Sequence, residues 1–297
     1  MWRRALFFTV QEFERRLELL QRWDVRVLPL GEAVRRLQAE TLPSRAVVLT
    51  FDDGSADFSE TVWPLLKQYG YPATVYATTY YSEKRRPIFP LMCAYVLWKG
   101  RRKVVDAVPE LGVTEAVDPS NAGQREIAAR AIIDRADLDG LGADEKDRRV
   151  ARLAELVGVD YEDLLRRRVL QAMTPEEIRQ VAAEGADVQL HTHRHRTPRC
   201  RDLFEREIVE NRTRLELLTG RRAEHFCYPS GVHHREFLPW LAAQRVVTAT
   251  TTIPRLATAD SLPLLLPRIV DVAAMAPIEL EGWLSGANQI MPRRGKE

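Results

Sequence analysis

Hydrophobic positions along the chain follow two patterns, helical spacing in longer stretches and short runs that are apolar throughout. The first helical stretch begins after Thr9, which has capping-box spacing to Glu12. One face of this stretch carries Phe13, Leu17 and Leu20. This spacing predicts an amphipathic helix near the start of the chain.

The run 46–50 is apolar up to its final threonine, a pattern typical of strands in parallel sheets covered on both faces. A helix ending before Gly70 and a strand-like run at 73–78 follow it, which predicts a β-α-β unit. The alternation resumes after residue 172. Strands are expected at 187–191, 224–228, 246–250 and 265–271, with helices at 175–184, 202–219 and 235–243. Repeated β-then-α order predicts a parallel sheet or barrel.

Residues 81–172 interrupt this alternation with helix-forming stretches. Basic clusters at 84–86, 101–103 and 166–168 are interleaved with acidic residues, so a solvated helical face is the favoured interpretation. Contact with an acidic glycan or a membrane surface is the alternative. We therefore expect one domain over 1–297 that contains a mostly helical insertion at 81–172.

Composition narrows the class of protein. With 45% hydrophobic and 29% charged residues the chain can bury a large core, which excludes a disordered, collagen-like or coiled-coil protein. The net charge of +2 gives no reason to expect nucleic acid as a partner. Three scattered cysteines do not make a disulfide framework, so a reducing compartment is expected. No apolar run reaches membrane-spanning length.

Two carboxylates, Asp52 and Asp53, stand just beyond the run 46–50. Ligands in α/β folds bind beyond the carboxyl ends of strands, so this position suits chemistry. One carboxylate could bind a cation while its neighbour accepts a proton. An ordinary Asp-Asp-Gly turn is the alternative.

Three of the six histidines, His191, His193 and His195, fall within five residues at another strand end. Alternate residues of an extended chain point the same way, so spacing makes all three candidate ligands. Two imidazoles, one carboxylate and an open position for water form a catalytic zinc site.

A third strand end carries the sequence Phe-Cys-Tyr-Pro-Ser-Gly at 226–231, followed by His233 and His234. A Pro-x-Gly turn can present a backbone N–H to a developing oxyanion. An ordinary turn between a strand and a helix is the alternative.

Together these motifs resemble those of the polysaccharide deacetylases of carbohydrate esterase family 4, which includes chitin, peptidoglycan and nodulation-factor deacetylases. The T-F-D-D-G and H-T-x-x-H motifs are specific, and the Y-P-x-G element supports them. The segments that match are 46–58, 64–79, 173–195 and 225–231. The resemblance implies an irregular (β/α) barrel with fewer than eight regular strands and an active site at its carboxyl-end face.

The resemblance also implies roles for individual residues. Asp52 becomes the general base, and the backbone N–H of Ser230 takes the oxyanion position. The implied metal is Zn²⁺ or another divalent transition metal such as Co²⁺ or Ni²⁺, with no organic cofactor. Its ligands would be Asp53, His191 and His195, which leaves His193 outside the metal's ligands, while Tyr228 and Pro229 would shape the pocket.

The chain departs from the family pattern in two places. Cys227 stands where the family's base-orienting arginine usually lies, and Arg268 at a later strand end is the expected substitute. In the extracellular biofilm-glycan branch of the family, which the Y-P-x-G element resembles, a histidine from an N-terminal Tyr-His strand supplies the catalytic acid, but here no histidine precedes His191. The C-terminal Leu-x-His element that supplies the acid in other members does not appear either. Either the true start lies upstream, or His233, His234 or His193 supplies the acid, or the protein is catalytically poor.

The expected function is removal of N-acetyl groups from an amino-sugar glycan or glycan precursor, with release of acetate. A catalytically weak or inactive glycan-binding or assembly protein on the same fold is the alternative. An iron(II) oxygenase would use the same ligand set, but it gives Asp52 no role. The expected partner is an N-acetylated sugar, and the sequence does not predict the oligomeric state.

Localisation follows from the N-terminus as it is written. The apolar run 5–10 is shorter than the roughly 7–15 residues that a signal peptide needs, and no cleavage site follows it. The expectation is therefore a cytoplasmic protein, or an extracytoplasmic one if the N-terminus is truncated. The glycosylation sequon at 211–213 lies in a helical pattern and is interpreted as chance.

Overall fold

The computed structural model describes residues 7–290, which divide into two compact units. The first unit contains the described residues up to Tyr80 and from Pro175 onward. The second unit contains residues 81–174.

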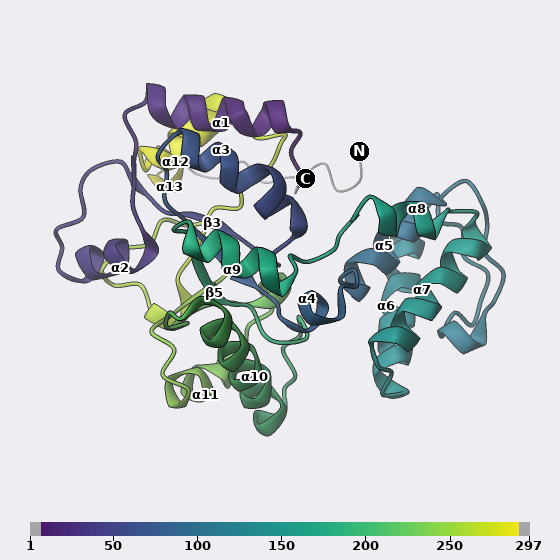
Figure 1. Cartoon of the computed structure of the whole chain (residues 1–297). Helices are drawn as coiled ribbons and strands as arrows, with labels where there is room; N and C mark the ends of the chain where they lie inside the picture. Colours follow the sequence, from purple (N-terminus) through teal and green to yellow (C-terminus); the bar gives the residue numbers. More distant parts are fainter. Residues whose placement is uncertain (1–6, 291–297) are drawn as a thin grey trace. The chain divides into compact units, whose positions relative to one another are not determined.

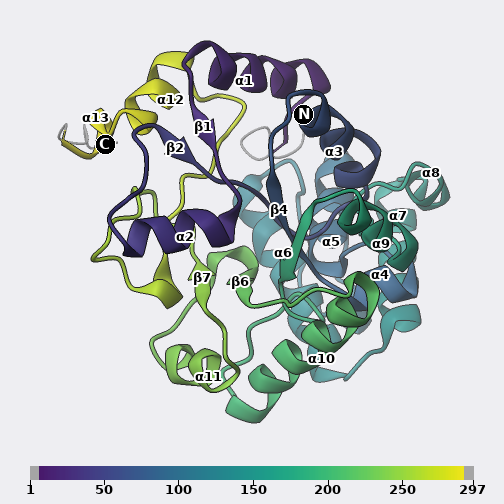
Figure 2. The same cartoon turned by 60° about the vertical axis from the view of Figure 1, so that its left-hand side comes forward.

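The first unit is built on a curled, wholly parallel sheet with the strand order β3-β4-β5-β6-β7. This half-barrel confirms the predicted irregular (β/α) barrel with fewer than eight strands. Because the strands are parallel and in sequence order, their carboxyl ends meet at one rim (Figure 2). The strands are β3 (Leu49–Phe51), β4 (Ala73–Ala77), β5 (Asp187–Leu190), β6 (His225–Cys227) and β7 (Thr248–Thr250).

Helices surround this sheet, and α9 and α10 pack directly against β5 (Figure 1). The helices of the first unit are α1 (Val10–Arg22), α2 (Leu30–Gln38), η1 (Phe58–Val62, a π-helix), α3 (Trp63–Gln68), α9 (Pro175–Ala183), α10 (Arg201–Thr219), η3 (Pro229–Gly231), α11 (Phe237–Ala243), η4 (Pro263–Leu265), α12 (Pro277–Leu284) and α13 (Ala287–Ile290). Helix α4 (Tyr80–Lys84) contains the boundary between the units. Within residues 7–290, no helix is both long enough and apolar enough to cross a membrane.

The predicted amphipathic helix is α1, and its capping box is formed. The Thr9 amide donates to the Glu12 carboxylate at 2.7 Å, and the Glu12 amide donates to the Thr9 hydroxyl at 3.2 Å. Leu17 and Leu20 are buried, as the spacing predicts.

The prediction of one continuous buried strand at 46–50 is wrong in two respects. This segment is divided into β2 (Ala46–Val47), which pairs with β1 (Arg26–Val27), and β3, which pairs with β4. Its residues are half-buried rather than buried, because β3 is the edge strand of the five-stranded sheet.

The strand expected at 265–271 is reduced to one parallel bridge between Leu266 and Thr250. Leu266 still makes two ladder hydrogen bonds, donating to the Ala249 carbonyl at 2.8 Å and accepting from the Thr251 amide at 2.9 Å. Pro267 comes next, and a proline has no N–H with which to continue the ladder.

The second unit is helical, and α5 packs against both α6 and α7. Its core includes Met92, Cys93 and Val96, none of which is exposed. Its helices are α5 (Phe89–Lys99), η2 (Pro109–Leu111), α6 (Ala122–Leu138), α7 (Ala143–Val157) and α8 (Tyr161–Arg166).

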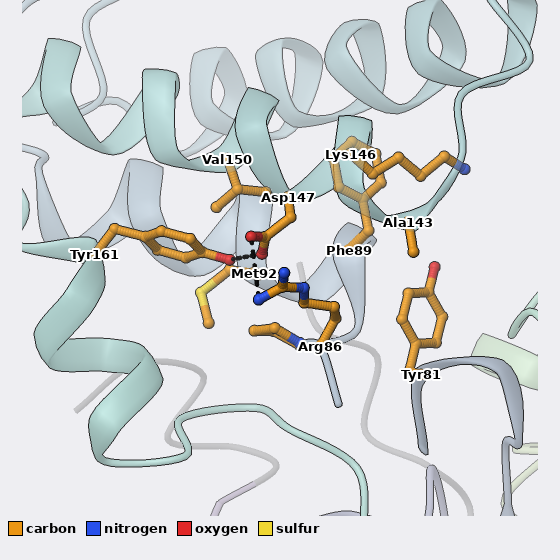
Figure 3. Close-up of a pocket in the computed structure, with 10 residues that line it drawn as sticks. Tyr81, Arg86, Phe89, Met92, Ala143, Lys146, Asp147, Val150 and Tyr161 are labelled. Carbon is orange, nitrogen blue, oxygen red and sulfur yellow. Dashed lines mark hydrogen bonds and ion pairs between the residues drawn. The ribbon is translucent and has the colours of Figure 1, made fainter. Parts of the chain in front are cut away.

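A pocket in this helical unit is drawn in Figure 3. Tyr161 donates a hydrogen bond to Asp147 at 2.6 Å, and Arg86 lies 3.5 Å from the same carboxylate. The pocket's free volume is about 10 Å³, which is room for about one water molecule. We therefore interpret these polar residues as part of the packing of the unit rather than as a ligand site.

Candidate metal centre and active site

Three of the expected site residues, Asp53, His191 and His195, come together at the rim of the sheet. One ligand atom from each lies within 4.8 Å of the others. The Nε2 atoms of His191 and His195 are 3.2 Å and 2.9 Å from the same Asp53 oxygen. Asp53 lies beyond the end of β3 and the histidines beyond the end of β5, so the parallel sheet brings the two segments to one place.

The histidine segment is not extended, contrary to the expectation from its spacing. Thr192 and His195 have φ angles of 63° and 52°, in the left-handed region. These two residues turn the chain, so His191 and His195 converge on Asp53 while His193 makes different contacts.

His193 lies outside the cluster, as the resemblance implied. Its Nδ1 is 2.8 Å from the Thr79 hydroxyl, and its side chain is 3% exposed. Burial, together with the charges of Arg214 and Arg194, lowers the pKa of His193 to about 3. A buried neutral imidazole that already has a hydrogen-bond partner is poorly placed to donate a proton to a substrate.

In the metal-free protein, the contacts within the cluster favour an ionised Asp53 carboxylate and a protonated His191. Burial alone would raise the pKa of Asp53, but His195 and His191 outweigh it and hold this pKa well below its usual range. Burial opposes a charge on His191, but its hydrogen bond to Asp53 and its interaction with the Cys227 side chain outweigh burial and raise its pKa.

The donor set fits a zinc-type ion. His191 Nδ1 donates to the Cys227 carbonyl at 2.8 Å, which leaves Nε2, the atom nearest Asp53, as the one able to bind a metal. Metal-binding histidines commonly have their second ring nitrogen held in this way. Two imidazole nitrogens and one carboxylate oxygen are the three protein ligands of many catalytic zinc sites.

Asp52 makes a two-point ion pair with Arg268. The two guanidinium nitrogens Nη1 and Nη2 donate to the two carboxylate oxygens, each at 2.7 Å. Burial would raise the pKa of Asp52, but the Arg268 charge and hydrogen bonds outweigh it and lower this pKa. Asp52 is therefore ionised at neutral pH.

Arg268 also contacts the residue that replaces the family's arginine. Its Nη2 lies 3.3 Å from the Cys227 sulfur, and its Nη1 donates to the Thr50 hydroxyl at 3.2 Å. Cys227 is completely buried, so a longer side chain at this position would meet the Arg268 guanidinium. The arginine reaches Asp52 from a different segment of the chain than in the family's usual motif.

The turn after β6 has a left-handed backbone at two successive residues, a conformation that suits glycine but is costly for serine. Ser230 and Gly231 have φ angles of 55° and 70°, and a Cβ atom on Gly231 would collide with the Thr252 side chain. Tyr228 beneath the turn is 1% exposed and donates to the Leu264 carbonyl at 3.0 Å. The turn is therefore fixed in shape, and the role of the Ser230 amide stays a prediction.

The other two candidate acids follow this turn. His233 Nδ1 donates to the Gly231 carbonyl at 2.8 Å, and its ring centre is 5.7 Å from that of Tyr228. His234 contacts the Phe237 ring edge-on at 5.2 Å. Both histidines are partly exposed, unlike His193.

Two buried residues of α10 were missed by the sequence analysis. Glu207 was not singled out, and Asn211 was noted only as part of a sequon. Both contact the histidine segment. The available signal was a pair of polar residues one helical turn apart at helical spacing from the apolar residues Phe204, Ile208 and Leu215.

Comparison with known proteins identifies the family to which the chain belongs. The profile of the family described as "Polysaccharide deacetylase" matches residues 39–113 and 152–247, more than half of the chain. A poly-beta-1,6-N-acetyl-D-glucosamine N-deacetylase from Staphylococcus epidermidis is 32% identical over 71 residues, which is 24% of this chain and 25% of that relative. The match thus spans about a quarter of the relative's length.

Solved structures share the fold at low sequence identity. The deacetylase PplD of Streptococcus pyogenes has a TM-score of 0.60 and 18% identity, with 94% of this chain and 88% of that one covered. IcaB from Ammonifex degensii has a TM-score of 0.58 and 17% identity, with 94% and 90% covered. With the family profile matching both segments that carry the site, the chain belongs to the polysaccharide deacetylase family.

Proposed function

We propose that the protein is a metal-dependent hydrolase that removes N-acetyl groups from an amino-sugar glycan or glycan precursor and releases acetate. The observation that carries this proposal is the convergence of Asp53, His191 and His195 beside a carboxylate, Asp52, paired with an arginine. Family membership supports acetyl removal, and the Staphylococcus epidermidis relative favours N-acetylglucosamine as the sugar.

In this proposal Asp53, His191 and His195 hold Zn²⁺ or a similar divalent ion. When bound, such an ion polarises a carbonyl and lowers the pKa of a bound water toward about 7. The three side chains offer the ligand atoms, and the Cys227 carbonyl orients one imidazole through its Nδ1–H at 2.8 Å.

Asp52 is the proposed general base. It must be deprotonated to accept the proton of the attacking water, and its lowered pKa keeps it so. Arg268 holds both of its oxygens at 2.7 Å and so fixes the direction of the carboxylate. This pairing gives Arg268 the base-orienting role that the resemblance assigns to another arginine.

The Ser230 amide is the proposed donor to the oxyanion that forms when water attacks the acetamide carbonyl. Removing one such donor typically lowers the catalytic rate by a factor of about 10²–10³. The left-handed backbone at Ser230 and Gly231 fixes the direction of this turn.

His233 is the proposed acid for the leaving amine. Its Nδ1–H is occupied by the Gly231 carbonyl, so Nε2 is the ring nitrogen that would carry the transferable proton. Its place on the turn that presents Ser230, and its partial exposure, favour it over the buried His193.

The first test separates metal binding from turnover. His191→Ala should lose the bound metal and the activity, because it removes a ligand. Asp52→Asn should keep the metal and lose turnover by orders of magnitude, because it removes only the base. The readouts are metal content and acetate released from N-acetylglucosamine oligomers.

Glu205→Gln provides a control, because its carboxylate pairs with Arg201 on the surface of α10 at 2.9 Å. It should behave as the unsubstituted protein in both assays. Equal metal content and equal acetate release in all variants would contradict the assignment. Metal binding without acetate release from any oligomer would favour a glycan-binding protein instead.

A further inference from the structure

The buried face of α10 carries two polar side chains, Glu207 and Asn211, one helical turn apart. Glu207 is 1% exposed and Asn211 is completely buried. Burying a polar group lowers the stability of the fold unless the group is hydrogen-bonded. The hydrogen-bond partners of Glu207 and Asn211 therefore indicate what these residues do. Both residues direct their polar atoms at the segment that holds His191 and His195.

Asn211 joins the first candidate ligand to the neighbouring strand. Its Oδ1 accepts a hydrogen bond from the His191 amide at 2.9 Å. Its Nδ2 donates to the Ala77 carbonyl at 3.0 Å and to the Thr79 hydroxyl at 3.1 Å. The chain at the end of β5 is thereby fixed to the chain at the end of β4.

Glu207 holds the chain between and just after the two histidines. Its carboxylate accepts from the Arg194 amide at 2.7 Å and from the guanidinium groups of Arg194 and Arg196 at 3.2 Å and 2.8 Å. Its main-chain carbonyl accepts from the His193 amide at 3.1 Å. Two guanidinium groups therefore neutralise the buried carboxylate, and four hydrogen bonds fix residues 193–196.

These contacts act on a strained backbone. Thr192 and His195 both have positive φ, which costs a non-glycine residue roughly 1–2 kcal/mol. Such conformations persist only where surrounding contacts determine them. Glu207 and Asn211 bond to His191, His193, Arg194 and Arg196, the residues on either side of the two strained positions.

We propose that Glu207 and Asn211 are positioning residues that preform the metal centre from α10 without touching the metal. They hold His191 and His195 in the converging arrangement before a cation arrives. The inference rests on the proposed function, since it takes these histidines as ligands. Residues that orient metal ligands typically change metal affinity by about 10–100-fold when they are replaced.

The test compares Asn211→Ala and Glu207→Gln with the unsubstituted protein. Glu207→Gln keeps the side-chain volume, so it carries the test if Asn211→Ala does not fold. The zinc dissociation constant is measured by competition with a chelator, and the visible absorption of bound Co²⁺ reports the ligand geometry. Each variant should bind zinc about 10–100-fold more weakly and change the Co²⁺ spectrum.

Glu205→Gln is the matched control, because it makes the same substitution on the same helix at an exposed ion pair. It should leave the zinc affinity and the Co²⁺ spectrum unchanged. A merely structural role would lower the melting temperature of the metal-free variants but leave both metal readouts of the folded protein as they were. That result would overturn the inference.

The failure of this inference is distinguishable from the failure of the proposed function. If the unsubstituted protein binds zinc and the folded variants bind it equally well, only the positioning role is wrong. If the unsubstituted protein binds no divalent transition metal, the proposed function is wrong and the inference falls with it.

Discussion

At the scale of single residues, the chemistry of the site depends on which atoms are already occupied. His191 and His233 each use Nδ1 to donate to a main-chain carbonyl at 2.8 Å, so each presents Nε2. His193 instead has its Nδ1 2.8 Å from the Thr79 hydroxyl, which itself receives a hydrogen bond from Asn211. Hydrogen-bond partners thus assign different roles to histidines that the sequence makes look alike.

The role of His233 can be tested by the choice of leaving group. His233→Gln should lower the hydrolysis of N-acetylglucosamine oligomers by about 10²–10⁴-fold, because an amine must be protonated as it leaves. Hydrolysis of an aryl acetate should fall far less, because a phenolate leaves without a proton. The measurement is the ratio of the two rates.

His234→Gln is the control for this ratio, since it removes the neighbouring imidazole, which contacts Phe237. It should leave the ratio unchanged. If His233→Gln lowers amide and ester hydrolysis equally, or neither, another group provides the proton.

At the scale of elements, parallel strands and the helices after them carry the site. The ends of β3, β5 and β6 place Asp53, His191 and Cys227 at one rim. Helix α10 then supports the histidine segment with Asn211 and Glu207. Each strand end offers one or two side chains, and only the register of the sheet brings them to one point.

The first helix offers a test of local stability. Thr9→Ala should lower the free energy of unfolding by about 0.5–2 kcal/mol, because it leaves the Glu12 amide without its capping hydroxyl. Urea unfolding followed by circular dichroism measures this difference. Thr41→Ala is the control, because Thr41 is exposed and follows the end of α2 rather than capping the start of a helix. Equal losses in both variants would contradict the capping argument.

At the scale of the whole molecule, zinc should stabilise the barrel unit because it binds only the folded arrangement. Free zinc at about 100 times its dissociation constant contributes about 2.7 kcal/mol, which raises the melting temperature on the order of 5–10 °C. A thermal scan with and without zinc measures this shift, and a chelator should reverse it. The His191→Ala variant should show no shift.

The rise in melting temperature caused by zinc should grow as the pH increases from acidic to mildly alkaline values. The pKa of His191 is raised in the metal-free protein, so below that pKa a proton must leave before the imidazole can bind metal. Conversely, the stability that its pairing with Asp53 adds to the metal-free protein is present at low pH and is lost as pH rises through the raised pKa. Zinc affinity should therefore rise roughly tenfold per pH unit for each proton displaced, and a flat profile would exclude His191 as a ligand.

The sequence by itself determined the parallel β/α order, the capped first helix and the identity of Asp52, Asp53, His191 and His195 as candidates. These inferences needed only local information, namely apolar periodicity, a capping spacing and titratable residues at strand ends. The sequence analysis also suggested Arg268, because it stands at an expected strand end, although that strand proved to be a single bridge.

Only the tertiary structure decided which of these groups meet. The expected direction of the His193 side chain was wrong because positive φ angles at Thr192 and His195 turn the chain, and contacts from the following helix α10 maintain this turn. Arg268 reaches Asp52 across 216 residues of sequence, and Asn211 reaches His191 across 20. Such pairings depend on strand register and helix packing, which no local pattern of residues encodes.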